Sequence, residues 1–187
     1  MSLNNFIHQF HNAFNLNIVS TVIKYANNVA FQKAQIGKDG IVDENIRKVA
    51  LHPLRADHKL LSNVHWSNYF NYHITSYMNH YLKLKKFKYS STINCLNQIE
   101  LLKYTETNHY DFHIDGDSYI NRTLSAILFL NNDYKNGELC FKNPINDDEY
   151  IVKPVCGSLV IFPSNMFFPH SVKPISKGIR YTIVAWA

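Results

Sequence analysis

Residues 101–115, LLKYTETNHYDFHID, contain two strand-like segments around a polar turn, and the second segment ends in two side chains of ligand type. The first strand is predicted over residues 93–104 and the second over residues 111–114, since both are rich in β-branched or aromatic residues. His113 and Asp115 stand two residues apart at the end of the second strand. Because residues i and i+2 of a strand project to the same side, both side chains can reach one ion.

The rest of the C-terminal half continues this pattern of short strands, separated by clusters of Asn, Asp, Gly and Pro. Further strands are predicted over residues 123–130, 138–141, 150–154, 158–162, 170–172 and 180–186. With the first two strands this makes about eight, the number typical of a jelly-roll made of two packed sheets.

The N-terminal half is predicted to be mainly helical. Apolar residues recur at three- and four-residue steps over residues 17–34, and an aromatic stripe over residues 65–82 indicates a second helix whose face packs in the core. Between them, Lys38-Asp39-Gly40 signals a turn that precedes a candidate short strand.

Helices first and strands afterwards predict an α+β fold, a double-stranded β-helix (jelly-roll, cupin-like) with the N-terminal helices packed outside the sheet. One domain is expected over residues 1–187, with helical support over about 1–92 and the jelly-roll core over about 93–187.

Composition indicates a globular protein, because 46% of the 187 residues are hydrophobic. No apolar run approaches the roughly 20 residues of a membrane-spanning helix, and the N-terminal residues lack the features of a secretory signal. A cytoplasmic protein with no membrane partner is therefore expected. The net charge of +5 includes a lysine-rich run over residues 83–88. That run is interpreted as a solvated connection, because no recognised nucleic-acid-binding module accompanies it.

His170, in the downstream segment FFPHSVKPISKGIRY, supplies a third candidate ligand. Two imidazoles and one carboxylate hold Fe(II) on one face and leave the other positions open for oxygen chemistry. Arg180 follows on the neighbouring strand, and its planar fork suits the distal carboxylate of a 2-oxo acid that chelates the metal through its other end. Thr182 lies on the same strand face as Arg180 and is placed to add a hydroxyl beside that ion pair.

The order of these motifs resembles that of the 2-oxoglutarate- and Fe(II)-dependent dioxygenases of the prolyl 4-hydroxylase type. The matching stretches are LLKYTETNHYDFHID (101–115), RTLSAILFLNNDYKNGELCF (122–141), CGSLVIFP (156–163) and PHSVKPISKGIRYTIVAW (169–186). The resemblance implies a jelly-roll that uses Fe(II), 2-oxoglutarate and O2, with ascorbate as a stimulant. The implied reaction hydroxylates a substrate C–H bond and releases succinate and CO2. The implied substrate is a prolyl residue of a peptide or protein, converted to 4-hydroxyproline.

The resemblance also implies roles for single residues. His113, Asp115 and His170 would be the iron ligands and so the catalytic residues. Arg180 would bind the distal carboxylate of 2-oxoglutarate. Tyr104, in the KY position of the family, would line the cosubstrate pocket and donate its hydroxyl.

Three further positions either match the family or depart from it. Trp186 matches a late tryptophan of the family and would form a wall near the iron. Phe129 replaces a tyrosine that helps some relatives to hold 2-oxoglutarate, which gives Thr182 or Tyr104 more weight here. Asn136 replaces the first glycine of a GGE-type turn, a change expected to affect loop shape more than chemistry.

Other readings stay open. Tyr104 could instead be a core packing residue of its strand, and packing is the favoured interpretation of Thr182 and Trp186. The same chemistry could act on another side chain, a free amino acid or a small metabolite. The ligand set could hold another divalent metal for isomerisation or hydrolysis, although Arg180 and its GIRYTIVAW context argue against that. The domain could also be a non-catalytic jelly-roll with a binding or structural role. The sequence identifies neither the substrate nor the oligomeric state.

Overall fold

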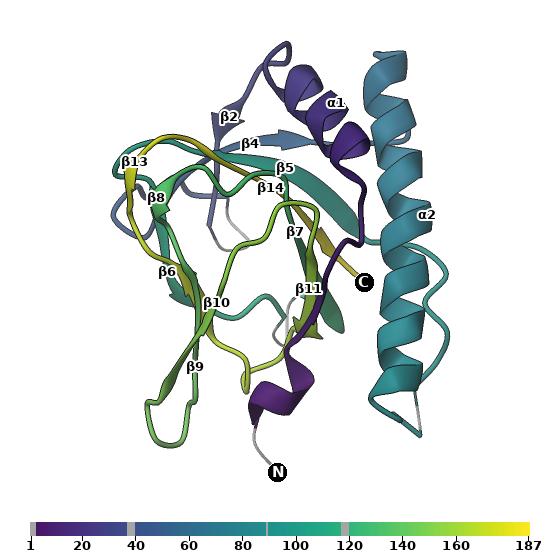
Figure 1. Ribbon diagram of the computed structural model, residues 1–187, viewed down its shortest axis with the longest axis vertical. Helices are drawn as coiled ribbons and strands as arrows, with labels where there is room; N and C mark the ends of the chain where they lie inside the picture. Colours follow the sequence, from purple (N-terminus) through teal and green to yellow (C-terminus); the bar gives the residue numbers. More distant parts are fainter. Residues whose placement is uncertain (1–2, 37–39, 89, 117–119) are drawn as a thin grey trace.

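The computed structural model describes residues 3–36, 40–88, 90–116 and 120–187. Two antiparallel sheets face each other, and two helices lie outside the larger sheet (Figure 1). The α+β jelly-roll predicted from the sequence is therefore confirmed. The turn predicted at Lys38-Asp39-Gly40 lies mostly outside the described residues.

The larger sheet has seven strands and joins the first part of the chain to the last. Its strands, in spatial order, are β1 (His8–Phe10), β11 (Leu159–Pro163), β7 (Leu124–Phe129), β14 (Arg180–Trp186), β5 (Gln98–Tyr104), β4 (Ala50–Pro53) and β2 (Gln32–Lys33). All of its pairings are antiparallel.

The smaller sheet has five strands, and a separate pair of short strands lies beside it. The order of the five is β10 (Glu149–Val152), β9 (Leu139–Lys142), β12 (His170–Val172), β6 (His109–His113) and β3 (Arg47–Lys48). The separate pair is β8 (Lys135–Asn136) with β13 (Ile175–Lys177).

Strand β14 shows how the larger sheet uses its two faces. Ile183 and Ala185 pack in the outer core against the helices, whereas Arg180, Thr182 and Trp186 line a cavity between the sheets. Alternate residues of a strand point to opposite faces. One strand can therefore hold the helices on one side and present functional groups on the other.

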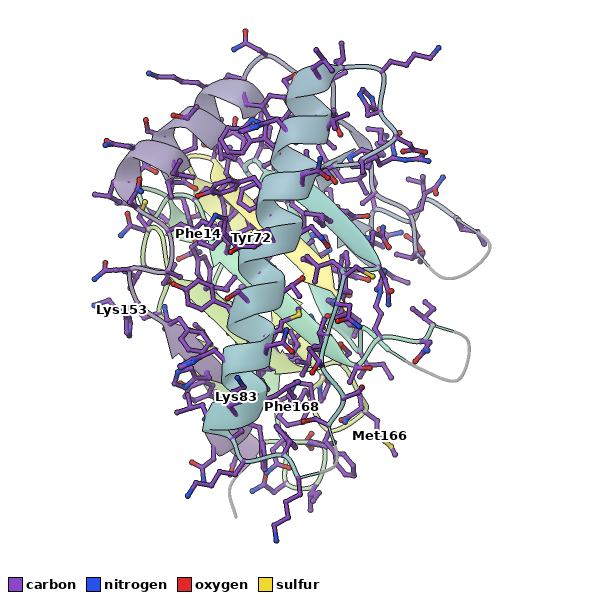
Figure 2. The ribbon with its side chains drawn as sticks, turned by 90° about the vertical axis from the view of Figure 1, so that its right-hand side faces the viewer. Phe14, Tyr72, Lys83, Lys153, Met166 and Phe168 are labelled. Carbon is purple, nitrogen blue, oxygen red and sulfur yellow. The ribbon has the colours of Figure 1, made fainter. Side chains whose placement is uncertain are left out.

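The helices are η1 (Leu3–Phe6), a 3-10 turn, α1 (Leu16–Ala26) and α2 (Leu61–Leu84). Helix α2 lies across the strands of the larger sheet (Figure 2) and buries Phe70, Ile74 and Met78 against them. The aromatic stripe predicted as core does pack in the core through Phe70 and Tyr81. No helix within the described residues combines the length and the apolar character needed to cross a membrane.

The first predicted helix is too long at its C-terminal end. The prediction ran over residues 17–34, but α1 ends at Ala26 and residues 32–33 form strand β2. The Asn28 side chain donates a hydrogen bond to the Lys24 carbonyl (2.7 Å), which gives the backbone an alternative to another helical turn. The periodic apolar residues continue past this stop, but they do not form helix.

The N-terminal half contributes more strand than predicted. The candidate short strand between the helices is confirmed as β3 and β4, whereas β1 and β2 were not predicted. These strands have two to four residues each. Strands β1, β3 and β4 pair with strands of the C-terminal half, and β2 pairs with β4.

Candidate active site

The three predicted metal ligands come from neighbouring strands of the smaller sheet. His113 is the last residue of β6 and His170 is the first residue of β12, and antiparallel pairing makes them direct cross-strand partners. Asp115 lies two residues beyond His113, in the segment that leaves the strand. The register of this one strand pair therefore places two imidazoles beside a carboxylate.

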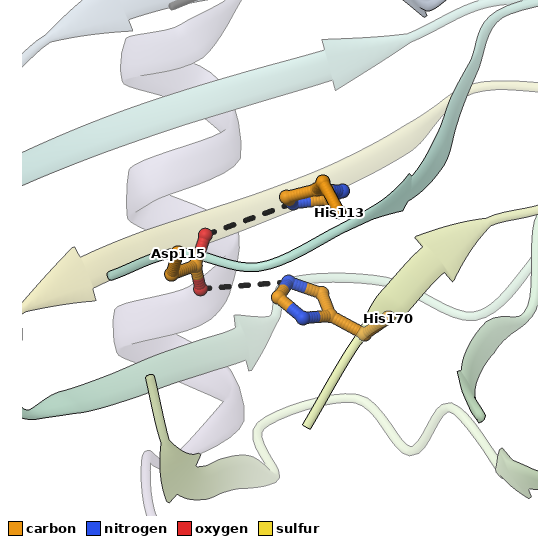
Figure 3. Close-up of side chains that lie close together, drawn as sticks. All are labelled: His113, Asp115 and His170. Carbon is orange, nitrogen blue, oxygen red and sulfur yellow. Dashed lines mark ion pairs between the residues drawn. The ribbon is translucent and has the colours of Figure 1, made fainter. Parts of the chain in front are cut away.

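The side chains converge on a common point (Figure 3). Nε2 of His113 lies 3.6 Å from Oδ1 of Asp115, and Nε2 of His170 lies 3.4 Å from Oδ2 of Asp115. The three candidate ligand atoms lie within 4.8 Å of one another, which makes this the one group of at least three such residues found in the described chain. Atoms at this spacing can share one ion.

Backbone carbonyls fix the orientation of both imidazoles. Nδ1 of His113 lies 2.8 Å from the Asp111 carbonyl, and Nδ1 of His170 lies 3.1 Å from the Phe168 carbonyl. Since a carbonyl only accepts, each Nδ1 carries the proton and each Nε2 keeps its lone pair. The lone pairs therefore face Asp115, as metal ligation requires.

The carboxylate is held from the larger sheet. The Ser125 hydroxyl, on β7, donates to Oδ2 of Asp115 (2.6 Å) and lies 2.8 Å from the hydroxyl of Ser164. Both serines are buried. This chain of hydroxyls orients Asp115 from behind, an arrangement that tunes ligands in metal sites.

The charge states also suit a metal. Burial lowers the pKa of His170 to about 4, against the opposing pull of Asp115, so this imidazole is neutral at neutral pH. Burial alone would raise the pKa of Asp115, but the histidines and the Ser125 hydrogen bond together hold it below its usual range. A neutral imidazole and an ionised carboxylate are the forms that bind metal.

A cavity of about 700 Å³ extends from these ligands to Arg180 and Thr182. Arg180 is 1% exposed, and its guanidinium carbon lies 4.9 Å from the ring centre of Tyr104 and 5.4 Å from that of Phe129. None of the ion pairs formed among the described residues involves Arg180. A buried cation without a counterion is costly, and a ligand carboxylate would provide one.

The other predicted pocket residues also line this cavity. Thr182 is fully buried, and its hydroxyl has no hydrogen-bond partner among the described residues. Burial raises the pKa of Tyr104, despite the opposing effect of Arg180, so its hydroxyl stays protonated and can donate. Trp186 forms part of the wall, with the Arg122 guanidinium 3.9 Å from its ring centre. The donor set thus fits a metal at one end of the cavity and a carboxylate at the other.

A polar network lies along one side of the cavity and was not predicted. Arg47 pairs with the buried Glu100 (3.4 Å), whose other oxygen accepts from Gln98 (2.6 Å). The side-chain oxygen Oε1 of Gln98 accepts in turn a hydrogen bond from the Arg122 guanidinium (2.8 Å). The sequence gives no local signal for this network, because its members lie on β3, β5 and the segment before β7 and meet only in the fold.

Asn136, the departure from the glycine of the family turn, lies in a backbone conformation that glycine usually adopts. Asn136 and Gly137 both have positive φ, 59° and 71°. Asparagine adopts the left-handed conformation more readily than most non-glycine residues, so it keeps this turn where a glycine is absent. A side chain at Gly137 would collide with Ile175, which explains glycine at the second position.

Comparison with known proteins agrees with this geometry. Residues 99–187 match the 2OG-Fe(II) oxygenase superfamily. The matched segment is just under half of the chain. The segment includes every site residue predicted from the sequence, and the resemblance to the prolyl 4-hydroxylase type is confirmed.

Three similar proteins show the extent of the likeness. A PKHD-type hydroxylase of Nitrosomonas europaea is 38% identical over 85 residues, which are 40% of this chain and 36% of that protein. Human prolyl 3-hydroxylase 2 is 35% identical over 72 residues, which are 37% of this chain and 10% of that protein. The crystal structure of a Pseudomonas putida prolyl-4-hydroxylase superposes with a TM-score of 0.70 at 19% identity, covering 97% of this chain and 91% of that one. The matched segment therefore spans about a third or less of the curated relatives, while the fold is shared along nearly the whole chain.

Proposed function

We propose that this protein is an Fe(II)- and 2-oxoglutarate-dependent dioxygenase that hydroxylates a peptidyl proline to 4-hydroxyproline. One observation supports this most directly. A single cavity has two imidazoles and a carboxylate at one end and a buried arginine without a counterion at the other. That pairing suits a metal and a dicarboxylate with one 2-oxo group, and it suits few other ligands.

In this proposal His113, Asp115 and His170 hold the iron. Arg180 binds the distal carboxylate of 2-oxoglutarate, and Thr182 and Tyr104 line that pocket. The bound iron, with 2-oxoglutarate and O2, supplies the oxidising chemistry that breaks the C–H bond and leaves succinate and CO2. The chain itself orients the ligands, neutralises the cosubstrate charge and excludes water.

The relatives support a proline substrate. They do not agree on the carbon that is hydroxylated, because both 3-hydroxylases and 4-hydroxylases of proline are among them. The curated relatives include a prolyl 3-hydroxylase, 35% identical over 72 residues, whereas the structural neighbour is named as a prolyl-4-hydroxylase. Hydroxylation at C3 is therefore the second candidate, with the same residues in the same roles. We further propose that residues 1–187 act as one oxygenase domain on a peptide or protein. The cytoplasmic location expected from the sequence stays a prediction.

Mass spectrometry of proline-containing peptides tests the function. Peptides are incubated with the protein, Fe(II), 2-oxoglutarate and ascorbate, and we expect a gain of one oxygen on proline together with formation of succinate. Amino-acid analysis of the product then separates 4-hydroxyproline from 3-hydroxyproline.

Variants at the ligands provide the controls. His113→Ala should abolish succinate formation, whereas His109→Ala, on the same strand but outside the ligand set, should retain it. Full succinate formation by the His113→Ala variant would show that the iron site is wrongly assigned.

A further inference from the structure

Strand β6 is irregular next to the candidate metal ligands. His113 pairs with His170, the first residue of β12. Three residues earlier on β6, Tyr110 pairs with Val172, which is only two residues further along β12. One extra residue on one strand of a pair is the pattern of a β-bulge, a feature that re-aims side chains beside active sites. Residues three apart in a regular strand point to opposite faces, but here Tyr110 and His113 both line the cavity.

The ring of Tyr110 lies flat on the imidazole of His113. The two ring centres are 3.5 Å apart, and the ring planes differ by 14°. Burial raises the pKa of Tyr110 to about 12, despite the opposing effect of Arg47, so the ring is a neutral phenol at neutral pH. The face of such a ring carries the negative part of its quadrupole. The bulge therefore places an electron-rich face against one of the three candidate ligands.

Arg47 holds the Tyr110 ring from the neighbouring strand. The two residues are direct partners in the pairing of β3 with β6, and the guanidinium carbon of Arg47 lies 4.8 Å from the centre of the Tyr110 ring. The guanidinium is itself anchored, because it donates to the Gln35 carbonyl (2.8 Å) and pairs with the buried Glu100 (3.4 Å). A cation is attracted to an aromatic face. The ring that packs on the imidazole is thus kept in place by a fixed charge.

His113 is the less enclosed of the two imidazole ligands. Its side chain is 17% exposed, whereas that of His170 is 4% exposed. Phe141 and Phe162 pack around the His170 ring, with ring centres 5.6 and 4.8 Å away. The contact between Nδ1 of His113 and the Asp111 carbonyl fixes one atom of the imidazole, but the ring can still tilt about that atom. A flat neighbour on its face removes this freedom.

The stack should also be stronger when the imidazole binds a metal. An imidazole that donates its Nε2 lone pair to a cation becomes poorer in electrons. An electron-poor ring is attracted to the face of a phenol for the same reason that a cation is. The contact therefore favours the metal-bound form of the site, in addition to orienting the ligand.

We propose that Tyr110 is a positioning residue for the metal ligand His113, and that Arg47 holds it in place. This role rests on the proposed function, because it requires His113 to bind a metal. Tyr110 acts through the flat face of its ring, and the bulge in β6 is what brings that face to the imidazole. The spacing of the two residues in the sequence does not predict the contact.

The test compares Tyr110→Leu, Tyr110→Met and Tyr110→Phe, with Mn(II) alone as the probe and calorimetric titration as the measurement. Leucine and methionine keep an apolar side chain but remove the flat face. Their Mn(II) affinity should fall about tenfold, the usual cost of losing a contact that orients a metal ligand. Phenylalanine keeps the face and removes only the hydroxyl, so Tyr110→Phe should bind Mn(II) like the wild type.

Tyr72→Leu is the matched control. It is the same substitution at a tyrosine that is 73% exposed on α2, and it should leave Mn(II) affinity unchanged. Circular dichroism and thermal melting of the metal-free proteins show which variants are folded. A purely structural role of Tyr110 would lower the melting temperature of the variants without changing the Mn(II) affinity of the folded protein.

Three results would overturn the positioning role and leave the proposed function intact. The first is wild-type Mn(II) affinity in a folded Tyr110→Leu or Tyr110→Met variant. The second is a loss in Tyr110→Phe as large as that in Tyr110→Leu, which would assign the effect to the hydroxyl. The third is failure of both apolar variants to fold, which would make Tyr110 a structural residue. Failure of the wild-type protein to bind Mn(II) would instead overturn the metal site, and the proposed function with it.

Discussion

The individual residues of the site are oriented by hydrogen bonds that come from outside the ligand set. His113 and His170 each use Nδ1 on a backbone carbonyl, and Asp115 receives a hydroxyl from Ser125. The ligand residues themselves were predicted, because the HxD spacing is local. Ser125 was not, because only the packing of the two sheets brings it to Asp115.

Removal of the Ser125 hydroxyl tests whether this contact tunes the metal site. In Ser125→Ala the carboxylate loses its buried donor, and Mn(II) affinity should fall about tenfold or more, the usual cost of such outer contacts. Calorimetric titration with Mn(II) measures the change. Ser90→Ala, at an exposed serine, should bind Mn(II) like the wild type. Equal affinities for Ser125→Ala and the wild type would show that Asp115 is oriented without Ser125.

At the scale of elements, the strands that carry the site are the best predicted part of the chain. The predicted bounds 170–172 and 180–186 are those observed for β12 and β14, because Pro169 and Pro174 flank β12 and Gly178 stands just before β14. Strands β1, β2, β8 and β13 were missed. Each has only two or three residues, too few for a pattern, and each depends on a partner distant in sequence.

The buried histidine His52 links strand β4 to helices α1 and α2. Nδ1 of His52, on β4, lies 2.8 Å from the Ala30 carbonyl. Its Nε2 lies 3.0 Å from the Tyr25 hydroxyl on α1 and 2.8 Å from the Asn63 amide nitrogen on α2. The amide nitrogen is a donor, so Nε2 must accept and the ring must be neutral. Burial lowers the pKa of His52 below the usual histidine value of 6.5, despite the opposing hydrogen bond to the Ala30 carbonyl.

This histidine should make stability depend on pH. Because the folded-state pKa lies below the unfolded one, its contribution is fully present above about pH 6.5 and is lost as pH falls from there through the folded pKa. His52→Gln should unfold more easily in urea at pH 7.5, by about 1–3 kcal/mol, and should lose less stability than the wild type between pH 7 and pH 5. The exposed His65→Gln is the control. A parallel pH dependence in His52→Gln and the wild type would contradict this.

At the scale of the whole molecule, both sheets contribute residues that line the cavity. The candidate metal ligands come from the smaller sheet and its loop, whereas Arg180 comes from the larger one. The order of the motifs along the chain predicted that these residues serve one site. The volume of the cavity and the polar network beside it depend on how the sheets pack, so sequence pattern alone could not supply them.

A ligand that spans the two sheets should therefore stabilise the whole fold. N-oxalylglycine with Mn(II), at about 100 times its Kd, should raise the free energy of unfolding by about 2.7 kcal/mol. For a chain of this size the melting temperature should rise by about 5–10 °C. N-oxalylglycine without the metal should give a smaller rise, because only its distal carboxylate then finds a partner.

Arg180→Met separates this binding from stability in general. The substitution removes a buried charge that has no counterion within the described residues, so the metal-free protein should melt no lower than the wild type. The additional rise caused by N-oxalylglycine over Mn(II) alone should largely disappear, since the distal carboxylate loses its cation. A non-catalytic jelly-roll would show no rise with either ligand in the wild type. A rise that persists unchanged in Arg180→Met would mean that the carboxylate binds elsewhere in the cavity.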